Sequence, residues 1–287
     1  MPRWAYVNGR YVRHRDAAVH VEDRGYQFAD GVYEVCQVVG GHPVDERRHL
    51  DRLERSLSEI EIDMPMSRAA FSAIQRELVR RNRIRDGLVY MQVTRGVAPR
   101  DHVFPSASVR PALVMTAKSI DMGVGERVAK SGIAVITVPE NRWPRVDIKS
   151  VGLLPNVLAR EEAKRAGARE AWFVDRDGFV TEGAATNAWI VTMDGVIVTR
   201  PAEFGILRGI TRTVVLEVAE RLGLAVEERA FTPDEAKAAR EAFITAATQI
   251  VMPVVRIDGE TVANGEPGSV AIELRKHFFD VAEISIF

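Results

Sequence analysis

The clearest indication of the fold is Trp172-Phe173-Val174-Asp175-Arg176-Asp177-Gly178-Phe179-Val180, in which an Asp-Gly pair separates two runs of strand-forming residues. Asx-Gly is the strongest short-range signal for a β-hairpin, because both residues tolerate the positive φ angles of primed turns. Three further pairs have similar surroundings: Asn8-Gly9, Asp194-Gly195 and Asp258-Gly259. The sequence therefore predicts mostly antiparallel sheets, and the lack of a regular βαβ alternation argues against a Rossmann fold.

Segments with helical periodicity lie between these strands, so we expect an α+β fold with helices flanking the sheets. Leucines and an isoleucine recur at helical spacing from Leu50 to Ile60,. Other helices are predicted from cap residues and apolar spacing. They are a helix capped by Ser67 that buries Phe71, Ile74 and Leu78, helices over 156–166 and 211–222, a helix with Thr232 and Glu235 in a capping box, and a last helix that Ser269 opens and that runs past Phe278.

The 287 residues are enough for one large domain or two ordinary ones,. The best candidate for a boundary is Lys118 to Arg127, where the segment 121–126 breaks both periodicities. We interpret Gly123-Val124-Gly125 as a linker, since a third glycine at the dinucleotide-binding spacing is missing,. The prediction is an N-terminal α+β domain over 1–120 and a C-terminal domain over 121–287.

Composition narrows the class of protein. Lys+Arg 39 against Asp+Glu 40 gives a net charge of −1, so nucleic acid is not an expected partner, and the basic run 80–85 is interpreted as a solvated helix end,. The single cysteine, Cys36, excludes a disulfide within the chain and is expected to be a buried thiol,. No histidine pair has zinc-binding spacing, so no metal site is expected. No segment approaches the roughly 20 apolar residues of a membrane span, and we expect a soluble, cytoplasmic protein.

Two residues could carry chemistry together. Lys149 lies in Val146-Asp147-Ile148-Lys149-Ser150, which we expect to form a strand, and Glu182 lies in a small-residue turn over 181–187. A lysine that forms a Schiff base and a carboxylate that keeps a pyridine nitrogen protonated are the two groups that pyridoxal 5′-phosphate (PLP) chemistry needs most. Each residue alone also has an ordinary interpretation, as an exposed lysine and as a carboxylate at the end of a hairpin.

Three other segments could bind anions. Gly209-Ile210-Thr211-Arg212 precedes an amphipathic helix, whose first N–H groups could hold a phosphate,. The run 245–248 follows a short apolar segment and is ambiguous. The run 99–105 carries Arg100 and His102, whose cations could hold a carboxylate or could simply be loop charges.

Taken in order, these pieces resemble the fold-type IV PLP enzymes, and among them most closely the D-amino-acid transaminases. The motifs that carry the resemblance extend over nearly the whole chain. They are 22–34, 49–53, 94–102, 147–150, 181–183 and 207–212. The resemblance implies a two-domain fold of mostly antiparallel sheets with PLP in the cleft between the domains.

The same resemblance implies roles for individual residues. Lys149 is similar to the lysine that forms the internal aldimine and moves the proton at the substrate Cα, and Glu182 to the partner of the pyridine nitrogen. Leu207 matches a side chain that packs against the cofactor ring. The phosphate ligands implied are Arg52 and the backbone N–H groups of Ile210, Thr211 and Ala247. Ala246 and Ala247 replace hydroxyl residues of some relatives, so weaker or redistributed phosphate contacts are expected.

The handedness of the substrate depends on a third group. In the D-specific relatives, residues matching Tyr33, Arg100 and His102 hold the substrate α-carboxylate, with the last two reaching in from the neighbouring subunit of a homodimer. The resemblance therefore implies a transaminase that moves the amino group of a D-amino acid to a 2-oxo acid by a ping-pong mechanism. Two enzyme alternatives share this scaffold, a branched-chain L-amino-acid aminotransferase and an aminodeoxychorismate lyase. A third alternative is a non-catalytic binding protein that has kept the fold.

Overall fold

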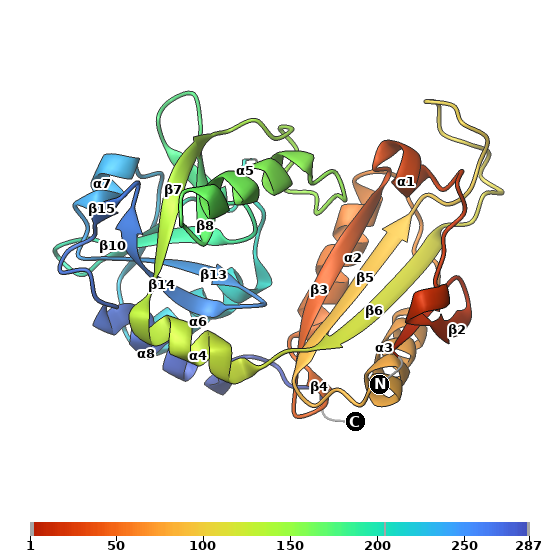
Figure 1. The fold of residues 1–287 in the computed structure, drawn as a ribbon, viewed down its shortest axis with the longest axis horizontal. Coiled ribbons are helices and arrows are strands. Elements are labelled where there is room, and N and C mark those ends of the chain that lie inside the picture. The colour runs from red at the N-terminus through yellow and green to blue at the C-terminus, as the bar shows by residue number, and fades with distance from the viewer. Residues whose placement is uncertain (1–2, 204, 286–287) are drawn as a thin grey trace. The chain divides into compact units, whose positions relative to one another are not determined.

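The computed structural model describes residues 3–203 and 205–285. Contacts divide them into two compact units (Figure 1). Unit 1 comprises the chain up to Asp121, the short segment Ile148–Gly152 and the residues from Glu283 on, and unit 2 comprises Met122–Asp147 and Leu153–Ala282. The division expected from sequence at 120/121 assigned all later residues to the second domain, whereas the contacts of the segment around Lys149 group it with unit 1.

Unit 1 contains a six-stranded sheet in the order β2-β1-β6-β5-β3-β4, in which all neighbours are antiparallel. The Asn8-Gly9 hairpin joins β1 and β2 as predicted, with φ of 44° and 92°. The strands are β1 (Trp4–Val7), β2 (Arg10–Arg13), β3 (Gly31–Val39), β4 (His42–Pro43), β5 (Gly87–Thr94) and β6 (Ala112–Ser119).

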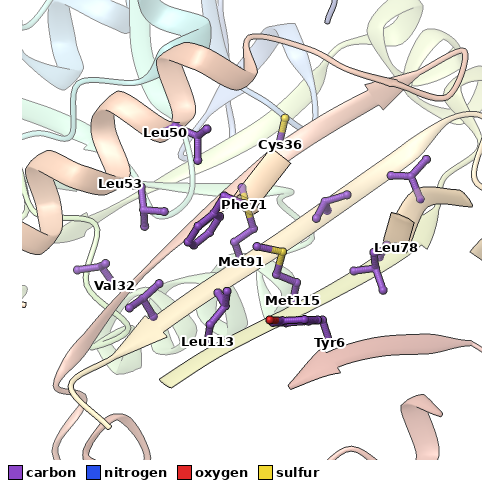
Figure 2. Packing of buried hydrophobic residues seen from close by; sticks show 14 of the residues in the cluster. Tyr6, Val32, Cys36, Leu50, Leu53, Phe71, Leu78, Met91, Leu113 and Met115 are labelled. Carbon is purple, nitrogen blue, oxygen red and sulfur yellow. The ribbon is translucent and has the colours of Figure 1, made fainter. Parts of the chain in front are cut away.

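Helices α2 (Glu46–Ser58) and α3 (Arg68–Asn82) pack on this sheet, and a short α1 (Arg24–Phe28) and the 3-10 turn His14–Asp16 complete unit 1 (Figure 1). Ser67 caps α3 as predicted, since its hydroxyl accepts from Ala70 N at 3.3 Å. Leu53 from α2 and Phe71 from α3 meet Met91 and Met115 of the sheet in one buried cluster (Figure 2). Fully burying each such side chain contributes about 1.5–3 kcal/mol to folding.

Unit 2 contains a nine-stranded sheet in the order β12-β11-β10-β13-β14-β7-β8-β9, with β15 beside β14. The predicted Asp-Gly turns join β8 to β9, β10 to β11 and β14 to β15. Parallel neighbours also occur, at β7–β8, β7–β14 and β11–β12, so the sheet is mixed. The strands are β7 (Ile133–Pro139), β8 (Glu170–Val174), β9 (Val180–Gly183), β10 (Asn187–Val191), β11 (Ile197–Thr199), β12 (Val226–Glu228), β13 (Glu241–Ala246), β14 (Ile250–Ile257) and β15 (Glu260–Thr261).

Two helices of unit 2 differ from the sequence prediction. The glycine segment 123–125 is part of helix α4 and is not a linker. Ala129 of this helix packs into the core of unit 2, and Glu126 pairs with Arg275 at 2.6 Å. These contacts outweigh the low helix propensity of glycine. The last helix ends at His277, and Phe278 begins a 3-10 turn. The helices are α4 (Met122–Ser131), α5 (Leu154–Arg165), α6 (Ile210–Arg221), α7 (Pro233–Lys237) and α8 (Ser269–His277), followed by the 3-10 turn Phe278–Asp280.

Two expectations drawn from composition can be compared with the described residues. Cys36 is fully buried, as expected, and burial raises the pKa of its thiol well above the usual range. In the parts of the chain that the structure describes, no helix combines the length and the apolar character that a membrane crossing requires.

Candidate active site

Lys149 lies on an irregular segment, and the prediction of a strand around it is wrong. Ser150 N donates to Ile148 O at 2.7 Å, which closes a three-residue turn centred on Lys149 and prevents an extended run,. The segment is nevertheless fixed. Lys149 O accepts from Tyr33 N of β3 at 3.0 Å, and Lys149 N donates to Ser56 Oγ of α2 at 3.4 Å. Both backbone groups of the lysine are therefore held by regular elements of unit 1.

The ammonium of Lys149 contacts a predicted substrate-binding residue. Its Nζ lies 4.2 Å from the centroid of the Tyr33 ring. That ring stacks on Tyr90 of β5 with centroids 5.5 Å apart, and burial raises the pKa of Tyr90 to about 12. Tyr33 and Lys149 were both selected from sequence, and the structure brings them together.

Arg52 is held by a buried carboxylate that sequence reasoning missed. Arg52 Nε and Nη2 donate to the two oxygens of Glu34 at 2.7 and 2.8 Å, and His49 Nδ1 lies 2.8 Å from Glu34 Oε2. Burial alone would raise the pKa of the Glu34 carboxyl, but Arg52 and His49 outweigh it and hold that pKa well below its usual value. The available signal was the spacing of His49 and Arg52, which places both on one face of α2.

Glu182 lies on β9 and is buried, rather than in a turn as expected. Strand β9 pairs with β8 as far as Gly183, and the turn begins only after it. Among the described residues, Arg142, Asn187 and Leu207 donate to this carboxylate. Glu182 Oε1 accepts from Arg142 Nη1 at 2.6 Å, and Oε2 accepts from Asn187 Nδ2 and Leu207 N, both at 3.0 Å. Arg142 and Asn187 were not predicted, because no local pattern relates them to Glu182.

Asn187 connects Glu182 to the start of α6. Its Nδ2 also donates to Leu207 O at 2.9 Å, and a Cβ added at Gly209 would come within 2.1 Å of its Oδ1. Gly209 is the N-cap of α6, and no side chain caps this helix. The first hydrogen bond to the cap runs from Thr213 N to Gly209 O, so the N–H groups of Ile210 and Thr211 have no acceptor within the helix,. The structure thus brings together Glu182, Leu207, Ile210 and Thr211.

Ala247 lies in the turn between β13 and β14. Gln249 N donates to Ala246 O at 3.0 Å across this turn. Thr245, the last residue but one of β13, pairs with Asn187 of β10, so the turn begins one residue beyond the position beside Asn187. Ala247 is therefore at the same end of the sheet as Glu182. The hydroxyl of Thr245 accepts from Trp189 Nε1 at 2.9 Å.

Arg100 and His102 are exposed and lie together beside Phe28. The Arg100 guanidinium carbon is 4.8 Å from the centroid of the Phe28 ring, and the His102 ring is 5.3 Å from it. Their loop is tied to the body of unit 1, since Arg24 Nη1 donates to Asp101 O at 2.6 Å. The side-chain contacts of Tyr33 are instead with Lys149 and Tyr90.

Comparison with known proteins identifies the family. The pattern of the family described as amino-transferase class IV matches residues 31–257, which is most of the chain. The chain is a class IV aminotransferase. The D-alanine aminotransferase of Bacillus licheniformis is 44% identical to it over 261 residues, covering 91% of this chain and 90% of that protein. The D-alanine aminotransferase of Listeria innocua is 42% identical over 275 residues, covering 96% and 94%.

Solved structures of class IV aminotransferases confirm the predicted fold type. The T.th. branched-chain amino acid aminotransferase, solved with pyridoxamine 5′-phosphate, has a TM-score of 0.90 and 27% identity, covering 98% of this chain and 94% of that one. The Escherichia coli branched-chain amino acid aminotransferase has a TM-score of 0.87 at 25% identity, covering 98% and 94%.

Class IV aminotransferases depend on PLP, and the residues of this chain fit that cofactor. Unit 2 offers a buried carboxylate for a pyridine nitrogen and, linked to it through Asn187, a helix start for a phosphate,. Unit 1 offers a lysine amine on a fixed backbone and an arginine with a fixed guanidinium. The chemistry of these groups matches the aldehyde, ring nitrogen and phosphate of PLP.

Proposed function

We propose that this class IV aminotransferase transfers the amino group of a D-amino acid such as D-alanine to 2-oxoglutarate or pyruvate, in two half-reactions of a ping-pong cycle. Bound PLP supplies the carbonyl carbon that receives the amino group and a ring that withdraws electrons from the substrate Cα. The observation that carries the proposal is the identity of 39–44% to D-alanine aminotransferases over more than nine-tenths of the chain.

In this proposal Lys149 binds the cofactor aldehyde and, once the substrate amine has displaced it, moves the proton at the substrate Cα. Two features support that role. Hydrogen bonds to Tyr33 N and Ser56 Oγ fix the backbone from which the side chain extends. The Tyr33 ring, 4.2 Å from Nζ, gives the ammonium a defined place,.

The other proposed cofactor-binding residues contact either the pyridine ring or the phosphate. Glu182 accepts the pyridine N–H, and Leu207 packs against the ring. Arg52 and the N–H groups of Ile210, Thr211 and Ala247 bind the phosphate, and the bidentate pair with Glu34 orients the Arg52 guanidinium,. Because Ala246 and Ala247 offer no hydroxyl, this phosphate site depends on backbone donors and on Arg52.

The D-specificity is assigned to Tyr33, Arg100 and His102, which hold the substrate α-carboxylate. We further propose a cytoplasmic homodimer in which Arg100 and His102 act in the partner's site. The exposure of both residues and of Val103 beside them, at 72%, supports a surface that a partner covers,. A buried, unpaired Cys36 fits a reducing compartment,.

The first test is the visible absorption spectrum of the purified holoenzyme with D-alanine and, separately, with L-leucine. Conversion to the pyridoxamine form by D-alanine alone supports the proposal. Conversion by L-leucine alone would identify an L-specific enzyme. That second candidate is favoured by the similarity to branched-chain amino acid aminotransferases, but at only 27% identity.

A further inference from the structure

Arg142 is a buried cation that contacts the carboxylate assigned to the pyridine nitrogen. It follows β7 in the chain, and its side chain is 6% exposed. Its Nη1 donates to Glu182 Oε1 at 2.6 Å. Its other edge pairs with Glu140, through Nε to Oε1 at 2.9 Å and Nη2 to Oε2 at 2.6 Å. The guanidinium therefore bridges two carboxylates, of which Glu140 holds it in a bidentate manner.

Further contacts fix the plane of this guanidinium. Its central carbon lies 4.3 Å from the centroid of the Phe173 ring of β8. Thr181 Oγ1, one residue before Glu182 on β9, donates to Glu140 Oε2 at 2.9 Å. A planar group held by a bidentate partner and an aromatic face has little freedom to rotate, so the direction of its bond to Glu182 is defined.

The charges of Glu140, Arg142 and Glu182 matter as much as the geometry of these three side chains. Burial alone would raise the pKa of the Glu140 carboxyl, but Arg142 lowers that pKa below its usual value, and the two carboxylates keep Arg142 protonated despite burial. With Glu182 ionised, as its proposed role requires, Glu140, Arg142 and Glu182 together carry one net negative charge. That charge is a suitable counterion for a protonated pyridine nitrogen, whereas Arg142 without Glu140 would leave the cluster neutral.

We infer that Arg142, oriented by Glu140, is a positioning residue that keeps Glu182 ionised and holds its carboxylate in the orientation that accepts the pyridine N–H. The inference rests on the proposed role of Glu182. Asn187 and Leu207 N occupy the second oxygen of Glu182, so three donors on two sides hold the carboxylate in one orientation. Arg142 acts through Glu182 and needs no contact with the substrate.

The test compares four holoenzymes: Arg142→Gln, Arg142→Lys, Glu140→Gln and the control Arg229→Gln, which removes an arginine that pairs with Glu235 elsewhere in unit 2. Each is measured for PLP affinity of its apo form, for the visible spectrum of bound PLP, and for kcat and KM with D-alanine. Losing a charge-assisted hydrogen bond predicts a roughly tenfold or greater loss in PLP affinity and in kcat for Arg142→Gln.

The expected pattern is specific to a positioning role. In Arg142→Gln the spectrum of bound PLP shifts and kcat falls, while KM changes by less than about threefold. Arg142→Lys restores part of the kcat and of the spectrum, Glu140→Gln has a smaller effect in the same direction, and Arg229→Gln has none. If Arg142→Gln fails to fold, the spectra and kcat of Arg142→Lys and Glu140→Gln are compared with those of the wild type and of Arg229→Gln.

Two results would separate this inference from the proposed function. Glu182→Gln with an unchanged spectrum and kcat would remove the role of Glu182, and with it the basis for Arg142. A large effect of Glu182→Gln, combined with wild-type spectra and kcat in folded Arg142→Gln or Glu140→Gln, would overturn the inference alone.

Discussion

Arg52 reaches the carboxylate of Glu34 with two donors, so a largely buried arginine on α2 and a fully buried glutamate on β3 form a bidentate pair. Replacing Glu34 by Gln removes the negative charge that compensates Arg52. Breaking a buried pair in this way costs about 3–5 kcal/mol. We expect Glu34→Gln to lower the free energy of unfolding of the apo-enzyme by an amount of that order and to weaken PLP binding. Urea denaturation and PLP titration would measure both. Glu77→Gln, which breaks surface pairs on α3, should change neither by much,.

The same carboxylates predict how stability depends on pH. The folded-state pKa values of Glu34 and Glu140 lie below their ordinary value. A carboxyl with a lowered pKa contributes stability that is fully present above its unfolded pKa of about 4.3 and is lost as the pH falls below it. We expect the wild type to lose more free energy of unfolding between about pH 7 and pH 3.5 than Glu34→Gln does. Equal losses in both proteins would contradict the assignment.

Lys149→Ala should remove both turnover and the visible absorbance of lysine-bound PLP, because no other amine occupies the fixed position beside Tyr33 in the described part of unit 1. The matched control is Lys118→Ala, an exposed lysine on β6. Absorbance spectra and transamination of D-alanine provide the measurements. A normal rate in Lys149→Ala, with a normal rate in the control, would refute its catalytic role.

Arg100→Ala should mainly raise KM for D-alanine, since a lost cation weakens binding of the α-carboxylate before and during the reaction alike. We expect roughly a tenfold increase or more, from loss of a charge-assisted hydrogen bond. Steady-state kinetics with D-alanine would test this. Arg110→Ala, an exposed residue farther along the same connection, serves as the control. An unchanged KM in Arg100→Ala would exclude a role of Arg100 in binding the substrate α-carboxylate.

Asp30 provides an indirect test of the same loop. Its Oδ2 accepts from Arg24 Nε at 2.7 Å and from Arg95 Nε at 2.8 Å, and those arginines contact the loop at Asp101 O and at the Phe104 ring. Asp30→Asn should therefore loosen the loop and raise KM for D-alanine with little change in kcat. Measuring KM alongside Asp16→Asn, an exposed carboxylate on a 3-10 turn, would check that the effect is local. Equal KM values for the two variants would argue against loop support by Asp30.

The parts of the fold that local chemistry determines could be predicted from sequence. Asn8-Gly9 forms its hairpin and Ser67 caps its helix, because turn geometry and capping depend on a few adjacent residues,. Gly123 and Gly125 were misread, since the packing of α4 on distant strands decides their conformation. Lys149 was predicted to lie on a strand and lies in a three-residue turn instead, because such a turn leaves no sequence signal.

The candidate site divides in the same way. Lys149, Glu182 and Arg52 were predicted as site residues from motifs, whereas the residues that hold their side chains or backbone in place were not predicted. Arg142 lies 40 positions from Glu182 in the chain, and Glu34 lies 18 from Arg52. Such pairs form only when strands and helices come together. The spacing of His49 and Arg52 on one face of a helix does not reveal that Glu34 is their partner, and no local pattern relates Arg142 to Glu182.

Because Ile148–Gly152 belongs to unit 1 while the residues on both sides belong to unit 2, the protein cannot be cut into its two units at one position. The chain passes from one unit to the other after Asp121, Asp147, Gly152 and Ala282, so neither unit is a continuous piece of polypeptide. A single break at the first crossing would yield two fragments, and the second would carry Lys149 away from the strand that fixes it. Splitting the protein at that point therefore requires that both fragments are present and assemble before the lysine is in place.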